Sequence, residues 1–201
     1  MPIRDCVVVA IEGTHASGKT TLVHALTSRL RASAIHAECT GEPARYSPFV
    51  EEVVLHGKGT FDLTTELDLF AMQLTTQLRA ARHRTVLITD KTLANVIAYA
   101  RLLLPAADKP ALAAMTQLCC AVSGMYDAVF YCTDAFNPDQ PGDSFRSKVA
   151  DRQHDIDTAL RSTCAETGIP LTDVPQRLTT AARVDWILRS LAERGVLPAL
   201  A

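Results

Sequence analysis

The sequence predicts an α/β protein in which a parallel sheet of about five strands lies between layers of helices. Short apolar segments rich in β-branched residues alternate along the chain with longer segments that have the three- and four-residue spacing of helices. Strands that alternate with helices pair in parallel, because each helix carries the chain back to the edge at which the previous strand began. The 201 residues are expected to form a single domain, over residues 1–201, with a sizeable core.

The first half of the chain accounts for three strands. The first apolar run is rich in valine and is expected to be buried on both faces. The second strand is half polar and ends where Gly41 and Pro43 break the pattern. We expect strands at residues 7–12, 34–40 and 85–90, helices at 19–31, 47–55 and 63–83, and a core-facing stripe of Leu63, Leu67, Phe70, Leu74 and Leu78 on the last helix.

The second half of the chain completes the sheet. Pro105 stops the helix that follows the third strand. A polar segment containing proline and glycine follows the fourth strand and leads into a charged helix. We expect strands at 128–132 and 169–173, and helices at 94–104, 110–122, 144–167 and 179–194.

A glycine-containing loop joins the first strand to the first helix, and residues 13–20 match Gly-x-x-x-x-Gly-Lys-Thr. Gly13 and Gly18 permit backbone angles that a Cβ atom forbids, so successive N–H groups can turn inward around an anion. The helix that follows adds its positive dipole end. Lys19 is expected to reach the β- and γ-phosphates of a nucleoside triphosphate, and the Thr20 hydroxyl to ligate Mg²⁺. The predicted nucleotide-binding residues are Gly13, Thr14, His15, Ala16, Ser17, Gly18, Lys19, Thr20 and Thr21.

Three acids stand at strand ends that are expected to lie beside this loop. Asp90 is a candidate to hold Mg²⁺ through water or to take the proton of an attacking hydroxyl, and a helix N-cap is its structural alternative. Glu42 is the rival base, with a plain turn residue as its alternative. Glu12 lies inside the buried end of the first strand, so its carboxylate must be paired. A structural link to a neighbouring basic group and a role in the chemistry both remain open for Glu12.

The long helix carries a second stripe, formed by Glu66, Phe70, Gln73 and Gln77. Spacings of four, three and four residues place these side chains on adjoining faces of the helix. Phe70 is expected to stack on a planar group, and the Gln73 amide to pair with the edge of a base. The alternative is that Phe70 belongs to the core and the glutamines are solvated.

A basic cluster follows the polar segment. Arg146 and Lys148 stand near the start of the charged helix, and residues 134–152 are expected to form a flexible lid. Closing over the triphosphate, these two cations would neutralise the charge that develops during transfer. The alternative is a solvated helix face.

Composition and charge restrict the classes of partner. The formal net charge of −2 gives no support to DNA or another nucleic acid polymer as a partner. No stretch resembles a membrane-spanning helix, and no signal peptide is expected before the first strand. The six cysteines show no metal-ligand spacing. These observations predict a reduced, cytoplasmic protein.

Five segments, spread over most of the chain, match sequence motifs that are found in other proteins. They are residues 12–20, the Glu-Pro pair at 42–43, residues 65–71 of the long helix, the Asp-Lys pair at 90–91 and the Ala-Tyr pair at 98–99. In these segments the chain resembles the thymidylate kinase and deoxynucleoside kinase group of P-loop phosphotransferases. The resemblance implies a three-layer P-loop NTPase fold and an acceptor pocket lined by the long helix.

Three positions depart from the thymidylate kinase pattern. That pattern has an acid at the position of His15 and arginines at the positions of Leu74 and Lys91. Leucine cannot hold an acceptor phosphate, and lysine lacks the bidentate fork of arginine. Phe70 and Gln73 are closer to the aromatic residue and glutamine with which deoxynucleoside kinases read a base.

The sequence therefore predicts a kinase that moves the γ-phosphoryl group of ATP, bound with Mg²⁺, to a nucleoside, nucleotide or related small acceptor. One alternative is a phosphotransferase for a non-nucleoside such as an antibiotic or a pyridine riboside. The other is a nucleotide-regulated binding protein without an acceptor. The helices between residues 94 and 122 are apolar enough to form a homodimer, or they are internal. The predicted catalytic residues are Lys19, Asp90, Arg146, Glu42 and Lys148, the substrate-binding residues Glu42, Phe70, Gln73 and Lys91, and the Mg²⁺ ligands Thr20 and Asp90.

Overall fold

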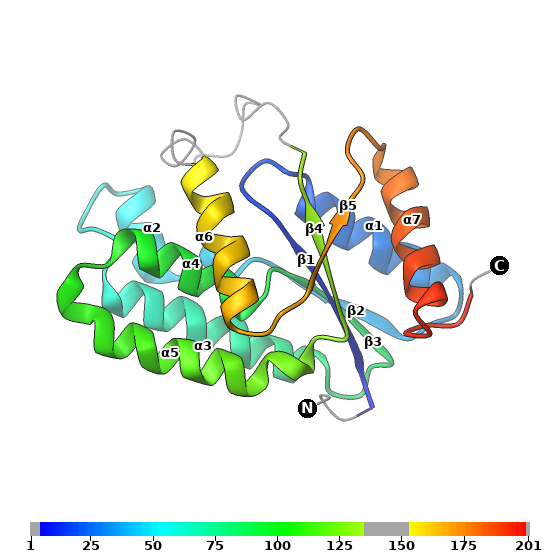
Figure 1. The fold of residues 1–201 in the computed structure, drawn as a ribbon, viewed down its shortest axis with the longest axis horizontal. Helices are drawn as coiled ribbons and strands as arrows, with labels where there is room; N and C mark the ends of the chain where they lie inside the picture. The colour runs from blue at the N-terminus through cyan, green and yellow to red at the C-terminus, as the bar shows by residue number, and fades with distance from the viewer. Residues whose placement is uncertain (1–4, 135–152, 200–201) are drawn as a thin grey trace.

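The computed structural model describes residues 5–134 and 153–199, and its centre is a five-stranded parallel sheet with the order β2-β3-β1-β4-β5 (Figure 1). The strands are β1 (Val7–Glu12), β2 (Ala37–Thr40), β3 (Val86–Asp90), β4 (Ala128–Cys132) and β5 (Leu171–Val174). The helices are α1 (Lys19–Ala32), α2 (Pro48–Val54), α3 (Leu63–Ala80), α4 (Leu93–Leu103), α5 (Lys109–Val122), α6 (Gln153–Glu166) and α7 (Thr180–Glu193), with short 3₁₀ helices η1 (Pro43–Arg45), η2 (Ala106–Asp108) and η3 (Ser123–Met125).

Two hydrophobic cores explain the three layers. Side chains of β1 alternate between them: Val8 and Ala10 pack with residues of α3, α4, α5 and α6, whereas Val9 and Ile11 pack with residues of α1 and α7. Figure 1 shows α1 and α7 on one side of the sheet and α3, α4, α5 and α6 on the opposite side. Because β1 is central and both of its faces are covered, its apolar run needs no polar alternation. The predicted three-layer α/β fold is confirmed.

The strand order places the candidate site. From β1 the sheet extends through β3 to β2 in one direction and through β4 to β5 in the other. Ligands of open α/β sheets bind beyond the carboxyl ends of the strands where the order reverses in this way. The loop after β1 and the segments after β2 and β3 meet at that place.

Several boundaries differ from those predicted. β2 begins at Ala37, because α1 is followed by a turn in which Ala34 has a φ of 60°. α6 is described only from Gln153, so the expected helix start and most of the expected lid, including Arg146 and Lys148, lie outside the described residues. Asp134 is the one residue of that segment that the structure describes.

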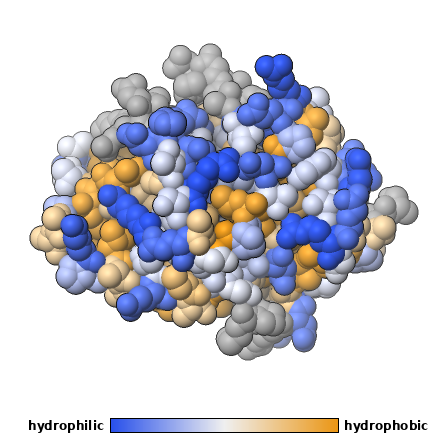
Figure 2. Space-filling view, in the orientation of Figure 1, coloured by the Kyte–Doolittle hydropathy of each residue, from blue (hydrophilic) through white to orange (hydrophobic). Residues whose placement is uncertain are grey.

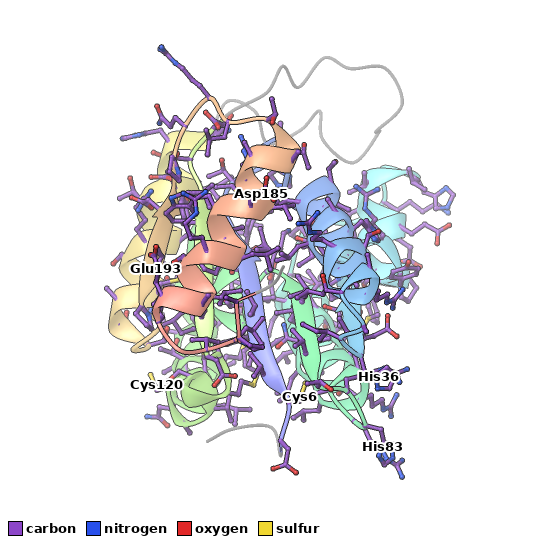
Figure 3. All side chains as sticks on the ribbon, turned by 90° about the vertical axis from the view of Figure 1, so that its right-hand side faces the viewer. Cys6, His36, His83, Cys120, Asp185 and Glu193 are labelled. Atoms are coloured by element: carbon purple, nitrogen blue, oxygen red, sulfur yellow. The ribbon has the colours of Figure 1, made fainter. Side chains whose placement is uncertain are left out.

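The end of the molecule at which the strands begin carries no part of the site. Figure 3 shows His36, His83 and Cys120 there, away from the loop after β1. Both histidines are exposed, as are His24, His56 and His154. Hydrophilic side chains separate the hydrophobic patches on the face seen in Figure 2. In the described part of the chain, no helix is long and apolar enough to cross a membrane.

Candidate active site

The loop after β1 has the backbone of an anion-binding nest. Gly13 has a φ of +139°, and a Cβ atom there would lie 2.6 Å from the carbonyl oxygen of Cys132. Gly18 caps α1 in the left-handed region, with a φ of 79°. Both glycines are therefore required by geometry. α1 begins at Lys19, so the N–H groups of its first turn have no partner within the helix and are available to a phosphate.

Lys19 is buried inside this loop. Its ammonium group donates to the Thr14 carbonyl oxygen at 2.5 Å and to the Ser17 hydroxyl at 3.3 Å. Burial lowers the pKa of Lys19, and the positive charge of Lys91 lowers it further, while Asp90 and other nearby carboxylates oppose the change. The lysine is thus held where the β- and γ-phosphates of a bound triphosphate would lie.

Thr20 and Asp90 lie side by side and fit a Mg²⁺ site. The Thr20 hydroxyl donates to Asp90 Oδ2 at 2.8 Å. Asp90 Oδ1 is buried and accepts no hydrogen bond from the residues that the structure describes. A hydroxyl and a carboxylate with a spare oxygen, next to a phosphate-binding loop, form a suitable donor set for Mg²⁺. The N-cap of α4 is Thr92, so Asp90 does not have the capping role that was its alternative.

Glu12 is a structural residue of the site. Its Oε1 accepts from the Thr92 N–H and hydroxyl, both at 2.6 Å, and its Oε2 accepts from Asn95 Nδ2 at 3.0 Å and from the Gly13 N–H at 3.2 Å. Burial raises the pKa of Glu12, and these hydrogen bonds oppose that effect. Its hydrogen-bond partners are neutral donors instead of the expected basic group. The residue ties the end of β1 to the first turn of α4.

Glu42 and Lys91 form an ion pair at the ends of β2 and β3. Lys91 Nζ lies 2.5 Å from Glu42 Oε1, and Arg45 Nε lies 3.5 Å from Glu42 Oε2. The charge of Lys91 holds the pKa of Glu42 at about 2, so this carboxylate stays ionised at neutral pH. Burial acts to lower the pKa of Lys91, but Glu42 and nearby groups more than reverse this and raise it. Both groups keep their charge.

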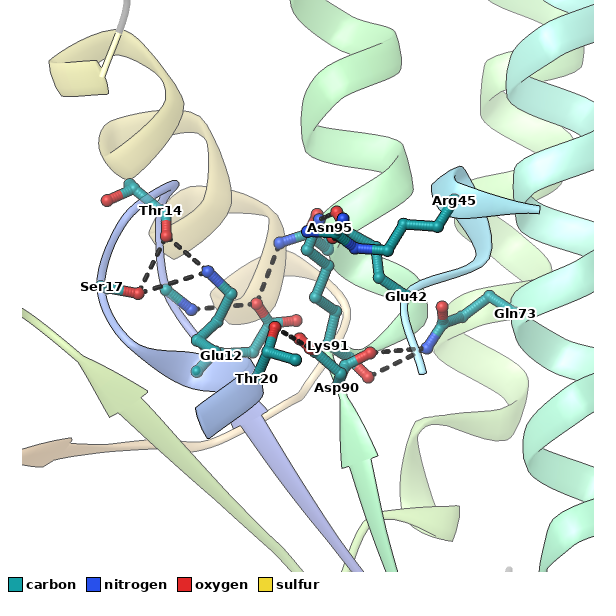
Figure 4. Close-up of polar contacts among 12 residues, drawn as sticks. Glu12, Thr14, Ser17, Thr20, Glu42, Arg45, Gln73, Asp90, Lys91 and Asn95 are labelled. Carbon is teal, nitrogen blue, oxygen red and sulfur yellow. Dashed lines mark hydrogen bonds and ion pairs between the residues drawn. The ribbon is translucent and has the colours of Figure 1, made fainter. Parts of the chain in front are cut away.

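Two glutamines of α3 hold the turn that carries Lys91. Lys91 has a φ of 72°, and its carbonyl oxygen accepts from Gln73 Nε2 and Gln77 Nε2, each at 3.1 Å. Gln73 Nε2 also donates to the Asp90 carbonyl oxygen at 3.2 Å, and Gln77 Oε1 accepts from the Tyr126 hydroxyl at 2.9 Å. Figure 4 shows the Gln73 amide oxygen on the side away from its backbone bonds. The Gln73 amide nitrogen is therefore occupied within the protein.

The buried face of α3 is the polar stripe. Thr65, Glu66, Phe70, Gln73 and Gln77 are buried, whereas Leu67 and Leu78 are 43% and 46% exposed. The expected core-facing stripe is wrong at these two leucines, because α3 packs over the end of β3, where backbone carbonyls need donors. Phe70 does not line the pocket. Instead it packs in the core with residues such as Leu87 and Ile97, which was its alternative.

An open pocket lies beside the phosphate loop. It holds about 800 Å³, open mouth included. Its walls are mostly apolar, and its polar lining comes from five elements or loops. The pocket is lined by Val50, Val54, Phe61, Leu69, Val96, Tyr99 and Leu103, by Pro43 and Ala44, and by the polar residues His15, Glu42, Arg45, Glu66, Gln73, Lys91 and Asn95.

Two residues at the loop had no signal in the sequence. Arg183 of α7 is 3% exposed, and it donates to the Ser17 carbonyl oxygen at 3.1 Å and pairs with Asp134. Gln153, at the start of α6, donates to Thr14 Oγ1 at 3.0 Å and to the His15 carbonyl oxygen at 3.2 Å. Both residues are ordinary members of helical patterns, and only the fold brings them to the loop.

Comparisons with known proteins agree with this geometry. The sequence pattern of an AAA domain family (AAA_28) matches residues 8–183. A NadR protein in complex with NR superposes with a TM-score of 0.71 at 17% identity, covering 99% of this chain and 53% of the NadR chain. The thymidylate kinase of Candida albicans has a TM-score of 0.67 at 16% identity, over 95% of this chain and 93% of its own.

A deoxyadenosine kinase of M. mycoides with bound dATP has a TM-score of 0.63 at 18% identity, over 92% of this chain and 99% of its own. The chain spans about half the length of the NadR proteins that it matches. No curated protein sequence matches it significantly. At these identities the structural likeness shows a shared fold.

Proposed function

The chain belongs to the AAA domain family of P-loop proteins, and from this premise we propose that it is an ATP-dependent kinase for a small acceptor. The reaction transfers the γ-phosphoryl group of ATP, bound with Mg²⁺, to an acceptor held in the apolar pocket. The acceptor is a nucleoside, a nucleotide or a related compound. Proteins with this fold include the thymidylate and deoxyadenosine kinases named above.

One observation carries the proposal: the phosphate loop and the pocket adjoin. His15 belongs to the loop and also lines the pocket, and its ring meets the pocket residue Tyr99 edge to face, with centroids 5.6 Å apart. Glu42 and Lys91 line the pocket, and their charges act on Lys19 inside the loop. A donor phosphate in the loop would therefore face an acceptor in the pocket, as in-line transfer requires.

Different residues of the site bind the phosphates, hold the metal and take up the proton. The loop N–H groups and Lys19 bind the β- and γ-phosphates, while Thr20 and Asp90 hold the metal. Mg²⁺ held by these two residues would neutralise charge on the β- and γ-phosphates. The acceptor oxygen forms a bond to the γ-phosphorus, the bond to the bridging oxygen of ADP breaks, and the proton of an acceptor hydroxyl passes to Glu42. Glu42 is assigned as base because it is ionised and lines the pocket, whereas Asp90 is assigned to the metal and is not among the residues that line the pocket.

Charge in the pocket favours an acceptor without a phosphate. Lys91 and Arg45 are both paired with Glu42. A monophosphate would have to compete with Glu42 for these cations. A pyridine riboside, the alternative considered from the sequence, also carries no phosphate and is the second candidate acceptor. We place neutral nucleosides and ribosides ahead of nucleoside monophosphates.

The test is a coupled assay of ADP release with MgATP and a panel of acceptors. The panel contains nucleosides, nucleoside monophosphates, a pyridine riboside and an aminoglycoside. We expect ADP release that depends on the acceptor, and a loss of at least about a hundredfold in Lys19→Ala, because a cation aimed at the transferring group is removed. The unfolding midpoint of this variant should stay within a few degrees of the wild-type value.

Two results would contradict the kinase. One slow rate of ADP release, whatever acceptor is present, would favour the nucleotide-regulated binding protein. Undiminished turnover in Lys19→Ala would remove the basis of the mechanism.

A further inference from the structure

Glu66 is a buried carboxyl that the mechanism does not use. It lies in the first turn of α3, is 1% exposed and lines the apolar pocket. Its Oε2 atom finds no hydrogen-bond partner among residues 5–134 and 153–199. A buried carboxyl without a partner destabilises a protein, so its position at a ligand pocket requires an explanation.

Burial favours the neutral form of the Glu66 carboxyl. Burial raises the pKa of Glu66 to about 8; the charge of Lys91, beyond β3, opposes this rise, and that of Asp62, the N-cap of α3, adds to it. Tyr99 of α4 lines the same pocket, and burial raises the pKa of its hydroxyl to about 12, so it is also neutral. Lys91 is paired with Glu42, and Glu42 also has Arg45 beside it. At pH 7 Glu66 is thus a carboxylic acid, which can donate a hydrogen bond.

The two side-chain amides of the pocket have their nitrogens engaged within the protein. Gln73 lies two turns along the helix, and its amide nitrogen is engaged with the carbonyl oxygens of Asp90 and Lys91. Gln73 therefore offers only its oxygen to a ligand. Asn95 Nδ2 is engaged with Glu12.

We propose that protonated Glu66 is a specificity-determining residue of the pocket: it donates a hydrogen bond to a carbonyl oxygen or ring nitrogen of a neutral heteroaromatic acceptor. This deepens the proposed function and rests on it, since it takes the pocket to be the acceptor site. The apolar walls and the Tyr99 ring suit a planar ring. The Gln73 oxygen can accept from a ring N–H or amino group, so an amide, lactam or amidine edge satisfies both residues.

The experiment measures binding without transfer. The four common 2′-deoxynucleosides are titrated by calorimetry into wild-type protein at pH 6.5, and the tightest binder is followed from pH 6.5 to 9. We expect binding by at least one of them, weakening about tenfold between pH 7 and 9 as Glu66 ionises. Because no ATP is present, a failure of the kinase proposal leaves this result intact, and a failure here leaves acceptor-dependent ADP release intact.

Three variants separate recognition from structure. Glu66→Gln keeps a donor that cannot ionise, so it should bind as the wild type does at pH 6.5 and lose the pH dependence. It also controls for ionisation of the ligand itself. Glu66→Leu should fold, since it removes a buried polar group, and bind about tenfold more weakly. Glu193→Gln on α7, exposed and remote, is the matched control and should leave binding and its pH dependence unchanged (Figure 3).

Three outcomes would overturn the proposal. Binding that strengthens as the pH rises and is lost in Glu66→Gln would mean that a Glu66 carboxylate holds a cationic ligand. Equal affinity in the wild type and Glu66→Leu would mean that Glu66 does not touch the ligand. Binding of none of the four deoxynucleosides would exclude the proposed class of acceptor.

Discussion

Glu42 and Lys91 fix each other's charge at the mouth of the pocket. Their side chains are 17% and 14% exposed, so water screens the pair only partly. For Lys91, the gain from pairing exceeds the effect of burial, because its pKa is raised overall. The acceptor is therefore expected to meet an ionised carboxylate and an ionised ammonium at any pH near neutrality.

The ion pair also predicts how stability depends on pH. The pKa of Glu42 is about 2 in the folded protein and near 4.5 in the unfolded chain. Its stabilisation is therefore complete above about pH 4.5 and is lost as the pH falls toward 2. Glu42→Gln should lower the free energy of unfolding by about 3 kcal/mol at pH 7, and by about half as much at pH 3.

Urea unfolding at the two pH values measures this difference. Glu38→Gln is the control, because Glu38 pairs with Arg31 and Arg84 at the surface, where ion pairs contribute less than about 1 kcal/mol. A cost for Glu42→Gln that does not change with pH would contradict the assignment of its pKa.

Helix α3 connects the pocket to the sheet. Its glutamines bind the turn after β3, and Glu66 and Leu69 face the pocket on the same side. Gln77 joins Tyr126 on one side to Thr89 and Lys91 on the other. The orientation of α3 is thus set by hydrogen bonds as well as by its apolar residues.

Substitutions on opposite faces of α3 test this orientation. Gln77→Leu should lower the free energy of unfolding by about 3 kcal/mol, because it leaves the Tyr126 hydroxyl and the Lys91 carbonyl oxygen with fewer partners. The adjacent residue provides the control: Leu78→Gln, at an exposed position, should change stability by less than about 0.5 kcal/mol. A larger loss of stability for Leu78→Gln than for Gln77→Leu would mean that the leucine face of α3 is the buried one.

For α3, the sequence predicts the helix but not the face that is buried. The spacing of its apolar residues correctly predicts a helix, since that spacing is a local property. Which face is buried depends on what the helix packs against, and here that is the polar edge of a sheet. For the same reason the sequence predicts that the Gln73 amide binds the edge of a base, although in the structure its nitrogen donates to the carbonyl oxygens of Asp90 and Lys91.

For the whole molecule, the order of the strands could be expected only in outline. The β-branched residues predict the individual strands, and the glycine loop identifies β1 as the strand beside the phosphates. The meeting of Thr20 with Asp90 and of Glu42 with Lys91 follows from β3 lying between β1 and β2. Arg183 and Gln153 reach the loop from far along the chain, and nothing local in the sequence marks them.

In the proposed kinase, the phosphate loop and the pocket serve one transfer reaction. The most direct measurement is a single-turnover reaction with excess protein, MgATP labelled at the γ-phosphate, and the acceptor that gives the fastest ADP release. We predict that the label appears covalently attached to the acceptor, and that Glu42→Gln lowers its rate of appearance by at least about a hundredfold. Label found only as inorganic phosphate, at a rate independent of the acceptor, would mean that the protein hydrolyses ATP and does not transfer its phosphoryl group to a molecule in the pocket.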